Sequence, residues 1–309
     1  MRRRVLGALL LLFLLLFATY SLIGLIGILD TRNTSKDPVS PAMNYLAQNY
    51  NSNLGLISET PHGNTYYLYS DNFLASFALQ AYGSGNKTLA EVALNVSSSV
   101  QKYLRAVPNA TNQYMVLSKC VGFFNDSKDY VVARIAGSTI LTTQNNGTSA
   151  LNPPDYADIA FLKALYDQCS GQSHAADQDF QNATKMYNGI GFNDSAFQTG
   201  PEQGWYQTYK LALYIFVGEA LGYQYPASVE TNLLKMQSSS GGFYTHYNAS
   251  FSTGNSTTNV ETTSLSILAL ARPGGTNVEE AFYIVSLPVI VVVALLTYRR
   301  AIRQDHGGP

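Results

Sequence analysis

Acidic side chains near the starts of several predicted helices are the residues of this sequence best suited to acid–base chemistry. The available acids are Glu59, Asp71, Asp155, Asp158, Glu202 and Glu261. Glycosidases need two carboxyl groups, about 5–5.5 Å apart for retention and about 6.5–9.5 Å apart for inversion, and burial raises the pKa of one of them. The candidate catalytic residues are therefore Asp71, Glu59, Glu202 and Glu261.

The same acids have a structural explanation. Asp and Asn are favoured N-caps because their side chains accept hydrogen bonds from free backbone N–H groups. Glu in a first turn interacts favourably with the helix dipole. Asp71, in the stretch "NLGLISETPHGNTYYLYSDNFLAS", is then simply the cap of a helix.

Aromatic side chains flank the same loops and could form platforms for sugar rings, since each has an apolar face and Tyr and Trp also have a polar tip. The candidate ligand-binding residues are Tyr66, Tyr69, Trp205, Tyr206 and Tyr244. The alternative is that these side chains fill the layer between core and solvent.

Other kinds of site lack a sequence signal. His62 and His246 lie in corresponding loops but have no partner at metal-ligand spacing, so we expect neither a metal nor a cofactor. No GxSxG, P-loop or GxGxxG motif occurs. With 19 Lys and Arg against 20 Asp and Glu, the chain has no basic patch, and we expect no nucleic-acid partner.

Apolar residues at spacings of three and four predict eight helices. Their ranges are 41–50, 71–82, 87–105, 155–168, 173–187, 202–221, 226–238 and 259–271. Between residues 107 and 153 the sequence is rich in Val, Ile, Tyr and Thr, which predicts a β-hairpin inserted between helices, with its turn at 125–127.

A two-helix unit recurs along the chain. Long connections, each containing Gly followed by an apolar residue, alternate with short ones. The Gly-containing pairs are Gly55-Leu56, Gly122-Phe123, Gly191-Phe192 and Gly242-Phe243. This recurrence predicts stacked helical hairpins, whose long loops share one end if successive helices are antiparallel.

The stretch "LLKMQSSSGGFYTHYNASFSTGNSTTNVETTSLSILALA" resembles the repeat of the α/α-toroid superfamily, which includes prenyltransferases, terpene cyclases and six-hairpin glycosidases. The resemblance is strongest over 226–271 and looser over 42–83 and 173–222. It implies an all-α, toroid-like array of about four helical hairpins, whereas full toroids have about six. The sequence lacks the aspartate-rich cyclase motif and the zinc ligands of prenyltransferases.

Two apolar runs predict membrane anchoring. Residues 5–29 form a signal-anchor or transmembrane helix, and 281–298 form a second transmembrane helix. Arginines flank both runs on their outer sides, so both termini are predicted to be cytoplasmic. A stem at 30–40 and the hairpin domain at 41–272 would then be extracytoplasmic, with 299–309 a cytoplasmic tail. A cleaved signal peptide is the alternative for the first run.

Glycosylation sequons support an extracytoplasmic domain. They begin at Asn33, Asn86, Asn95, Asn109, Asn125, Asn146, Asn182, Asn193, Asn248 and Asn255. The two cysteines, Cys120 and Cys169, form a candidate disulfide in an oxidising compartment. Two free thiols are the alternative.

The sequence leaves three functions open. The first is a membrane-anchored cell-surface glycoprotein whose long-loop face binds carbohydrate or a partner protein. The second is a glycan-active hydrolase or lyase that uses paired carboxylates on that face. The third is a structural envelope protein.

Overall fold

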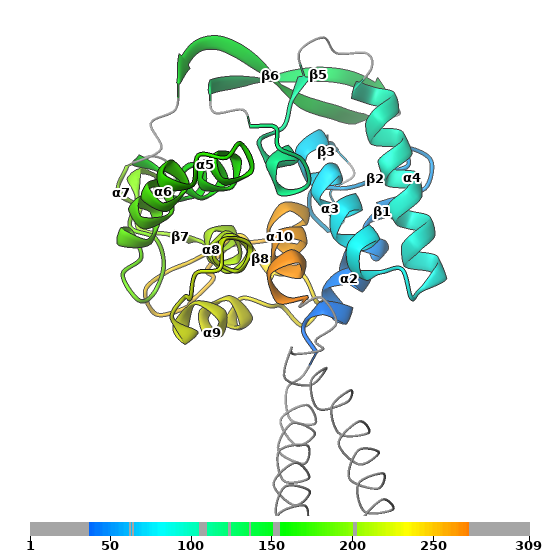
Figure 1. Ribbon diagram of the computed structural model, residues 1–309. Coiled ribbons are helices and arrows are strands. Elements are labelled where there is room, and N and C mark those ends of the chain that lie inside the picture. The colour runs from blue at the N-terminus through cyan, green and yellow to red at the C-terminus, as the bar shows by residue number, and fades with distance from the viewer. Residues whose placement is uncertain are drawn as a thin grey trace, which may run out of the picture. The chain divides into compact units, whose positions relative to one another are not determined.

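The computed structural model describes residues 37–61, 63, 65–104, 110–122, 125–135, 137–150, 155–199 and 203–271. These residues lie within one compact unit, Asp37–Arg272. Helices provide most of its core, and a long two-stranded ribbon lies beside them (Figure 1).

The predicted helices are present in the described part of the chain. Their bounds are α2 Val39–Gln48, α3 Tyr69–Tyr82, α4 Lys87–Leu104, α5 Ala157–Cys169, α6 Ser173–Lys185, α8 Thr208–Leu221, α9 Ala227–Lys235 and α10 Val260–Leu270. Two shorter elements are α7 Ser195–Gln198 and the 3-10 helix η1 Gln113–Leu117. Helix α8 starts later than predicted because the residues before it pair as a strand.

Five elements form a closed ring, which we call the helix ring. Helix α10 packs between α3 and α8, α8 packs against α5, and η1 contacts both α5 and α3. In α8 and α10 buried residues occur on all sides, as expected for central helices. The partner helices α4, α6 and α9 each bury one stripe; in α4 it includes Leu89, Val92 and Val96, a helical spacing.

The predicted all-α class is wrong, because the described residues also form four small sheets. The largest sheet has four strands: β3 Tyr66–Leu68, β4 Ala110–Thr111, β5 Asn125–Ile135 and β6 Ser138–Ala150. Each of the other three sheets is a pair of two-residue strands. The pairs are β1 Tyr50–Asn51 with β2 Leu56–Ile57, β7 Tyr206–Gln207 with β9 His246–Tyr247, and β8 Phe243–Tyr244 with β10 Thr258–Asn259. The fold is therefore mixed, with helical hairpins joined by strand-bearing loops. Two-residue strands are too short to produce a detectable alternation in the sequence.

The predicted β-hairpin exists, but its turn was misplaced. Strands β5 and β6 pair antiparallel, with Ile135 opposite Ser138, so the two strands are connected between these two residues rather than at 125–127. Gly137 there has a φ of 85°, a conformation that glycine adopts without penalty. The first predicted strand is instead η1, because the Asn112 side chain accepts a hydrogen bond from the Tyr114 N–H at 2.9 Å and caps the helical turn.

The prediction of two flanking transmembrane helices is corrected as well. Among the described residues, no helix has both the length and the apolar character needed to cross a membrane. The runs to which the prediction referred, 5–29 and 281–298, lie outside the described residues, as do the stem up to residue 36 and the tail.

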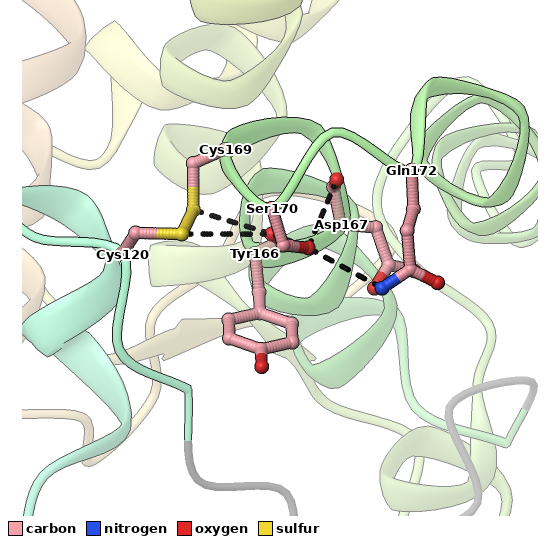
Figure 2. Close-up of a disulfide and its surroundings, with 6 residues drawn as sticks. All are labelled: Cys120, Tyr166, Asp167, Cys169, Ser170 and Gln172. Carbon is pink, nitrogen blue, oxygen red and sulfur yellow. Dashed lines mark hydrogen bonds between the residues drawn. A yellow bond between two sulfur atoms is a disulfide. The ribbon is translucent and has the colours of Figure 1, made fainter.

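A disulfide joins Cys120, which follows η1, to Cys169 at the end of α5 (Figure 2). The Cys169 sulfur lies 3.2 Å from the Tyr166 carbonyl oxygen, which also accepts a hydrogen bond from the Ser170 hydroxyl at 2.8 Å. The bond links the two elements that meet where η1 closes the helix ring, so it fixes that closure covalently.

Removal of this disulfide should destabilise the fold. The two cysteines are 49 residues apart, and a cross-link closing a loop of that size stabilises by roughly 4 kcal/mol through the unfolded state, with measured values of about 2–4 kcal/mol. We expect Cys120→Ala/Cys169→Ala to lower the free energy of unfolding by such an amount in denaturant titrations. A reductant should lower the stability of the wild-type chain but leave the double variant unchanged, and equal sensitivity of both proteins would contradict the prediction.

Candidate acid–base site

Residues from the first and last long loops meet at one end of the helix ring. The Asn259 side-chain amide donates to Glu59 Oε1 at 3.0 Å, and the Val260 N–H donates to the Glu59 carbonyl at 3.1 Å. The other side-chain atom of Asn259, Oδ1, accepts from the Thr262 N–H at 2.9 Å and caps α10. Asn259 therefore holds Glu59 against the start of a ring helix from 200 residues away in the chain.

Asp71 lies next to Glu59 and is only 2% exposed. Its Oδ1 accepts from the Ser70 hydroxyl at 2.8 Å. Its Oδ2 and Glu59 Oε2 are both buried, and neither has a conventional hydrogen-bond donor among the described residues. The two carboxyl groups are within hydrogen-bonding reach of each other, so one proton between them satisfies both oxygens.

Burial is the main cause that raises the pKa of Asp71 well above its usual range, and the neighbouring Glu59 and Glu261 raise it further. A buried carboxyl next to like charges is disfavoured in its ionised form. Burial and the neighbouring acids therefore favour the protonated form of Asp71.

Asp71 is not the N-cap that the structural explanation predicted. Helix α3 begins at Tyr69, its N-cap is Leu68, and no side chain caps it. Asp71 thus lies inside the first turn, where the helix dipole would favour its ionised form, but burial and the two other acids outweigh that effect.

Glu261 is the third carboxylate of the site. The Tyr114 hydroxyl, 1% exposed on η1, donates to Glu261 Oε1. Burial and then Glu261 raise the pKa of Tyr114, so this phenol stays protonated and remains a donor. Glu59, Asp71 and Glu261, together with Tyr114, form what we call the carboxyl cluster.

A second polar group continues from the carboxyl cluster toward α5 and α8. The Tyr209 hydroxyl donates to Asp158 Oδ2 at 3.0 Å, and burial, followed by Asp158, raises the pKa of Tyr209. The Lys210 ammonium, almost fully buried, forms an ion pair with Asp194 and lies 3.7 Å from Asp158 Oδ1. Asp194 also accepts from the Ala157 N–H at 3.0 Å, which ties the third long loop to the start of α5.

Charge is distributed unevenly between the two groups. Lys210 on α8 offsets Asp158 of α5 and Asp194, the N-cap of α7. Among the ion pairs formed by described residues, none involves Glu59 or Asp71, and burial together with the neighbouring acids favours the protonated form of Asp71. No three acidic, His or Cys side chains of the described part are arranged to hold a metal ion.

Of the five aromatic residues predicted to bind sugar rings, three are at least partly exposed and two are buried. Tyr66 is 55% exposed, and its carbonyl accepts from the Glu59 N–H at 3.3 Å. Trp205 is half-buried, with its ring centroid 5.0 Å from that of His246. Tyr244 is half-buried in β8. Tyr69 and Tyr206 are buried in the core.

The remaining candidate acids and His62 are either exposed or lie outside the residues that the structure describes. Asp155 is exposed just before α5. Glu202 and His62 fall outside the described residues. Sequence reasoning missed Tyr114, Asp194 and Lys210, although a lone lysine in the apolar run of α8 was a usable signal.

Four sequon asparagines are exposed on the described surface and two are half-buried. The exposed ones are Asn86, Asn95, Asn193 and Asn255, and the half-buried ones are Asn182 and Asn248. The side chains of the other four sequon asparagines lie outside the description.

No protein-family model, curated protein or solved structure matches the chain significantly.

Replacement of Lys210 should leave two buried acids without their cation. Breaking a buried ion pair from one side costs about 3–5 kcal/mol, so we expect Lys210→Met to lower the free energy of unfolding by that amount in urea titrations. The control is Lys87→Met, because the Lys87 side chain is 91% exposed. A loss of under about 1 kcal/mol for Lys210→Met would contradict the proposed role of the ion pair.

The raised pKa of Asp71 predicts that the contribution of this group to the stability of the fold is greatest in acid. Its folded pKa is raised above an unfolded value of about 3.9. The stabilisation is therefore complete below about pH 4 and is lost as the pH rises through the folded pKa, by up to about 1.4 kcal/mol per pH unit. Unfolding titrations from pH 4 to pH 7 should show this loss.

Asp71→Asn should reduce this loss, because an amide stays neutral and can still donate to Glu59. Glu91→Gln, at an exposed acid on α4, should retain the wild-type pH dependence. An unchanged slope in Asp71→Asn would show that another group causes it.

Proposed function

We propose that this chain is a glycan-active hydrolase whose acid–base groups are those of the carboxyl cluster. The observation that carries the proposal is the contact between the carboxyl groups of Glu59 and Asp71, whose facing oxygens are buried without another donor, next to the third acid Glu261. Perturbed carboxyl groups of this kind occur preferentially at functional sites, and glycoside hydrolysis uses one protonated and one ionised carboxyl group.

The three acids have different roles in this proposal. Glu59 is the member of the pair that is partly exposed, so we assign to it the transfer of the proton, which it must first receive from Asp71, to the glycosidic oxygen. Asp71 is a positioning residue: it does not contact the substrate, and it supplies the shared proton to Glu59. Glu261, partly exposed and held by Tyr114, takes a proton from the attacking water.

The proposed reaction is the hydrolysis of a glycosidic bond. The bond between the anomeric carbon and the glycosidic oxygen breaks, and that oxygen receives the proton of the Glu59–Asp71 pair. The water oxygen bonds to the anomeric carbon and loses its proton to Glu261. Transfer of that proton back to the pair through solvent restores the starting state.

An oxidising, extracytoplasmic setting fits the rest of the molecule. The Cys120–Cys169 disulfide forms and persists in such compartments. The exposed sequons at Asn86, Asn95 and Asn193 are accessible to a glycosylating enzyme. Tyr66 and Trp205 remain candidates for stacking against sugar rings on this side of the ring.

Binding without catalysis is the second candidate, favoured by an uncharged hollow beside Glu59. The two functions differ in what the carboxyl cluster contributes. A binding protein would tolerate neutral replacements in that cluster, whereas a hydrolase would not.

The test is release of reducing ends from a panel of neutral glycans by the purified chain. General acid–base groups typically contribute about 10²–10⁴-fold to the rate, so Glu59→Gln and Glu261→Gln should each lower kcat by such a factor. Glu91→Gln serves as the control. No turnover by the wild-type chain, or variants within about threefold of it, would refute the proposal.

A further inference from the structure

A hollow of about 420 Å³ opens beside the first long loop. Its wall comes from the end of α2 and from β1, and includes Tyr45, Gln48, Asn49 and Tyr50. Ser58 from the same loop also lines it. This volume lies within the range of about 300–1,000 Å³ that is typical of small-molecule sites.

The described side chains that line the hollow carry no charge. They provide amides, which both donate and accept hydrogen bonds, and hydroxyl groups, which do the same. Tyr50, which is half-buried, adds an aromatic ring with a polar tip. This combination suits the hydroxyl groups and apolar ring faces of a neutral sugar, and it offers no oppositely charged partner for a phosphate, carboxylate or ammonium group.

The wall is held in place before any ligand arrives. The Asn49 amide donates to the Tyr45 carbonyl at 2.9 Å, and the Asn51 amide donates to the Tyr67 hydroxyl at 2.9 Å. A Cβ at Gly242 would lie 2.5 Å from the Tyr45 ring, so only glycine permits this approach of the fourth loop. Preorganised walls reduce the entropic cost of binding.

Other polar groups of the wall remain available. No hydrogen bond among the described residues uses the Gln48 amide, the Asn49 Oδ1 or the Tyr50 hydroxyl. The Tyr45 hydroxyl is not one of them, because it is buried beside the Thr258 side chain. Gln48, Asn49 and Tyr50 can therefore serve a ligand without breaking protein contacts.

The hollow adjoins the carboxyl cluster. Ser58, which lines it, directly precedes Glu59 in the chain. Tyr45, which also lines it, is near Glu59: burial is the main cause that raises the pKa of the Tyr45 phenol to about 12, the Thr258 side chain opposes that rise, and Glu59 adds to it. A sugar in the hollow would therefore have its next linkage near Glu59.

We propose that this hollow binds a neutral oligosaccharide and forms the substrate subsite beside Glu59, a role that rests on the proposed hydrolase function. The substrate class is thereby narrowed to uncharged glycans. Sugars that carry carboxylate or sulfate groups at the bound residues would be excluded, because the described wall has no cation to receive them.

The test is calorimetric titration of the full chain with neutral tetrasaccharides of glucose, galactose and mannose, and with a uronic-acid tetrasaccharide. We expect at least one neutral tetrasaccharide to bind and the anionic one not to bind. Gln48→Glu places a charge in the wall without removing a protein hydrogen bond, and it should raise Kd about tenfold. Tyr50→Ala should do the same through loss of its ring.

Asn53→Asp is the matched control, since Asn53 is exposed in the same loop and does not line the hollow; its Kd should equal that of the wild type. Equal binding by Gln48→Glu and Tyr50→Ala, equal binding of the anionic sugar, or no binding of any neutral tetrasaccharide would overturn the subsite. Binding that depends on the hollow but is followed by no turnover would overturn the hydrolase function and leave the binding site intact.

Discussion

Two carboxyl groups in contact in a buried place cannot both be ionised, and the loop end of this fold is organised around that constraint. Glu59 and Asp71 come from one loop–helix unit, but the contact is enclosed by Asn259 and Glu261 from the last unit. Burial makes the shared proton necessary, since water cannot solvate a second charge there. The helix ring supplies that burial by bringing the starts of its helices to one end.

Short strands give the loops the rigidity that such a site needs. Strands β7 and β9 join the third and fourth loops, and β3 pairs with β6 to join the first loop to the ribbon. The disulfide fixes η1 to α5, and Lys210 links α8 to the third loop through Asp194. A functional group is positioned most accurately when its supporting residues are themselves held, and here each loop is tied to another element.

The sequence predicted the helices well and the site only in part. Apolar spacing located every long helix of the described chain because each buries a stripe or more against its neighbours. It misread η1 as a strand, since Tyr and Val favour strands and the cap from Asn112 outweighed that preference. Asp71 was identified correctly as an acid near a helix start, yet its environment depends on contacts with residues nearly 200 positions away, which no local pattern contains. Lys210 was missed because its partner Asp194 lies in a separate loop.

Stability and the proposed chemistry depend on the same proton. When the pair loses it, two adjacent buried carboxylates repel each other, and the group that would protonate a leaving oxygen is lost at the same time. The pH range over which the fold weakens should therefore coincide with the range over which activity declines. A purely structural pair would link pH to unfolding alone. A decline of activity over the same pH range as the loss of stability would therefore distinguish the proposed acid–base role of the pair from a structural one.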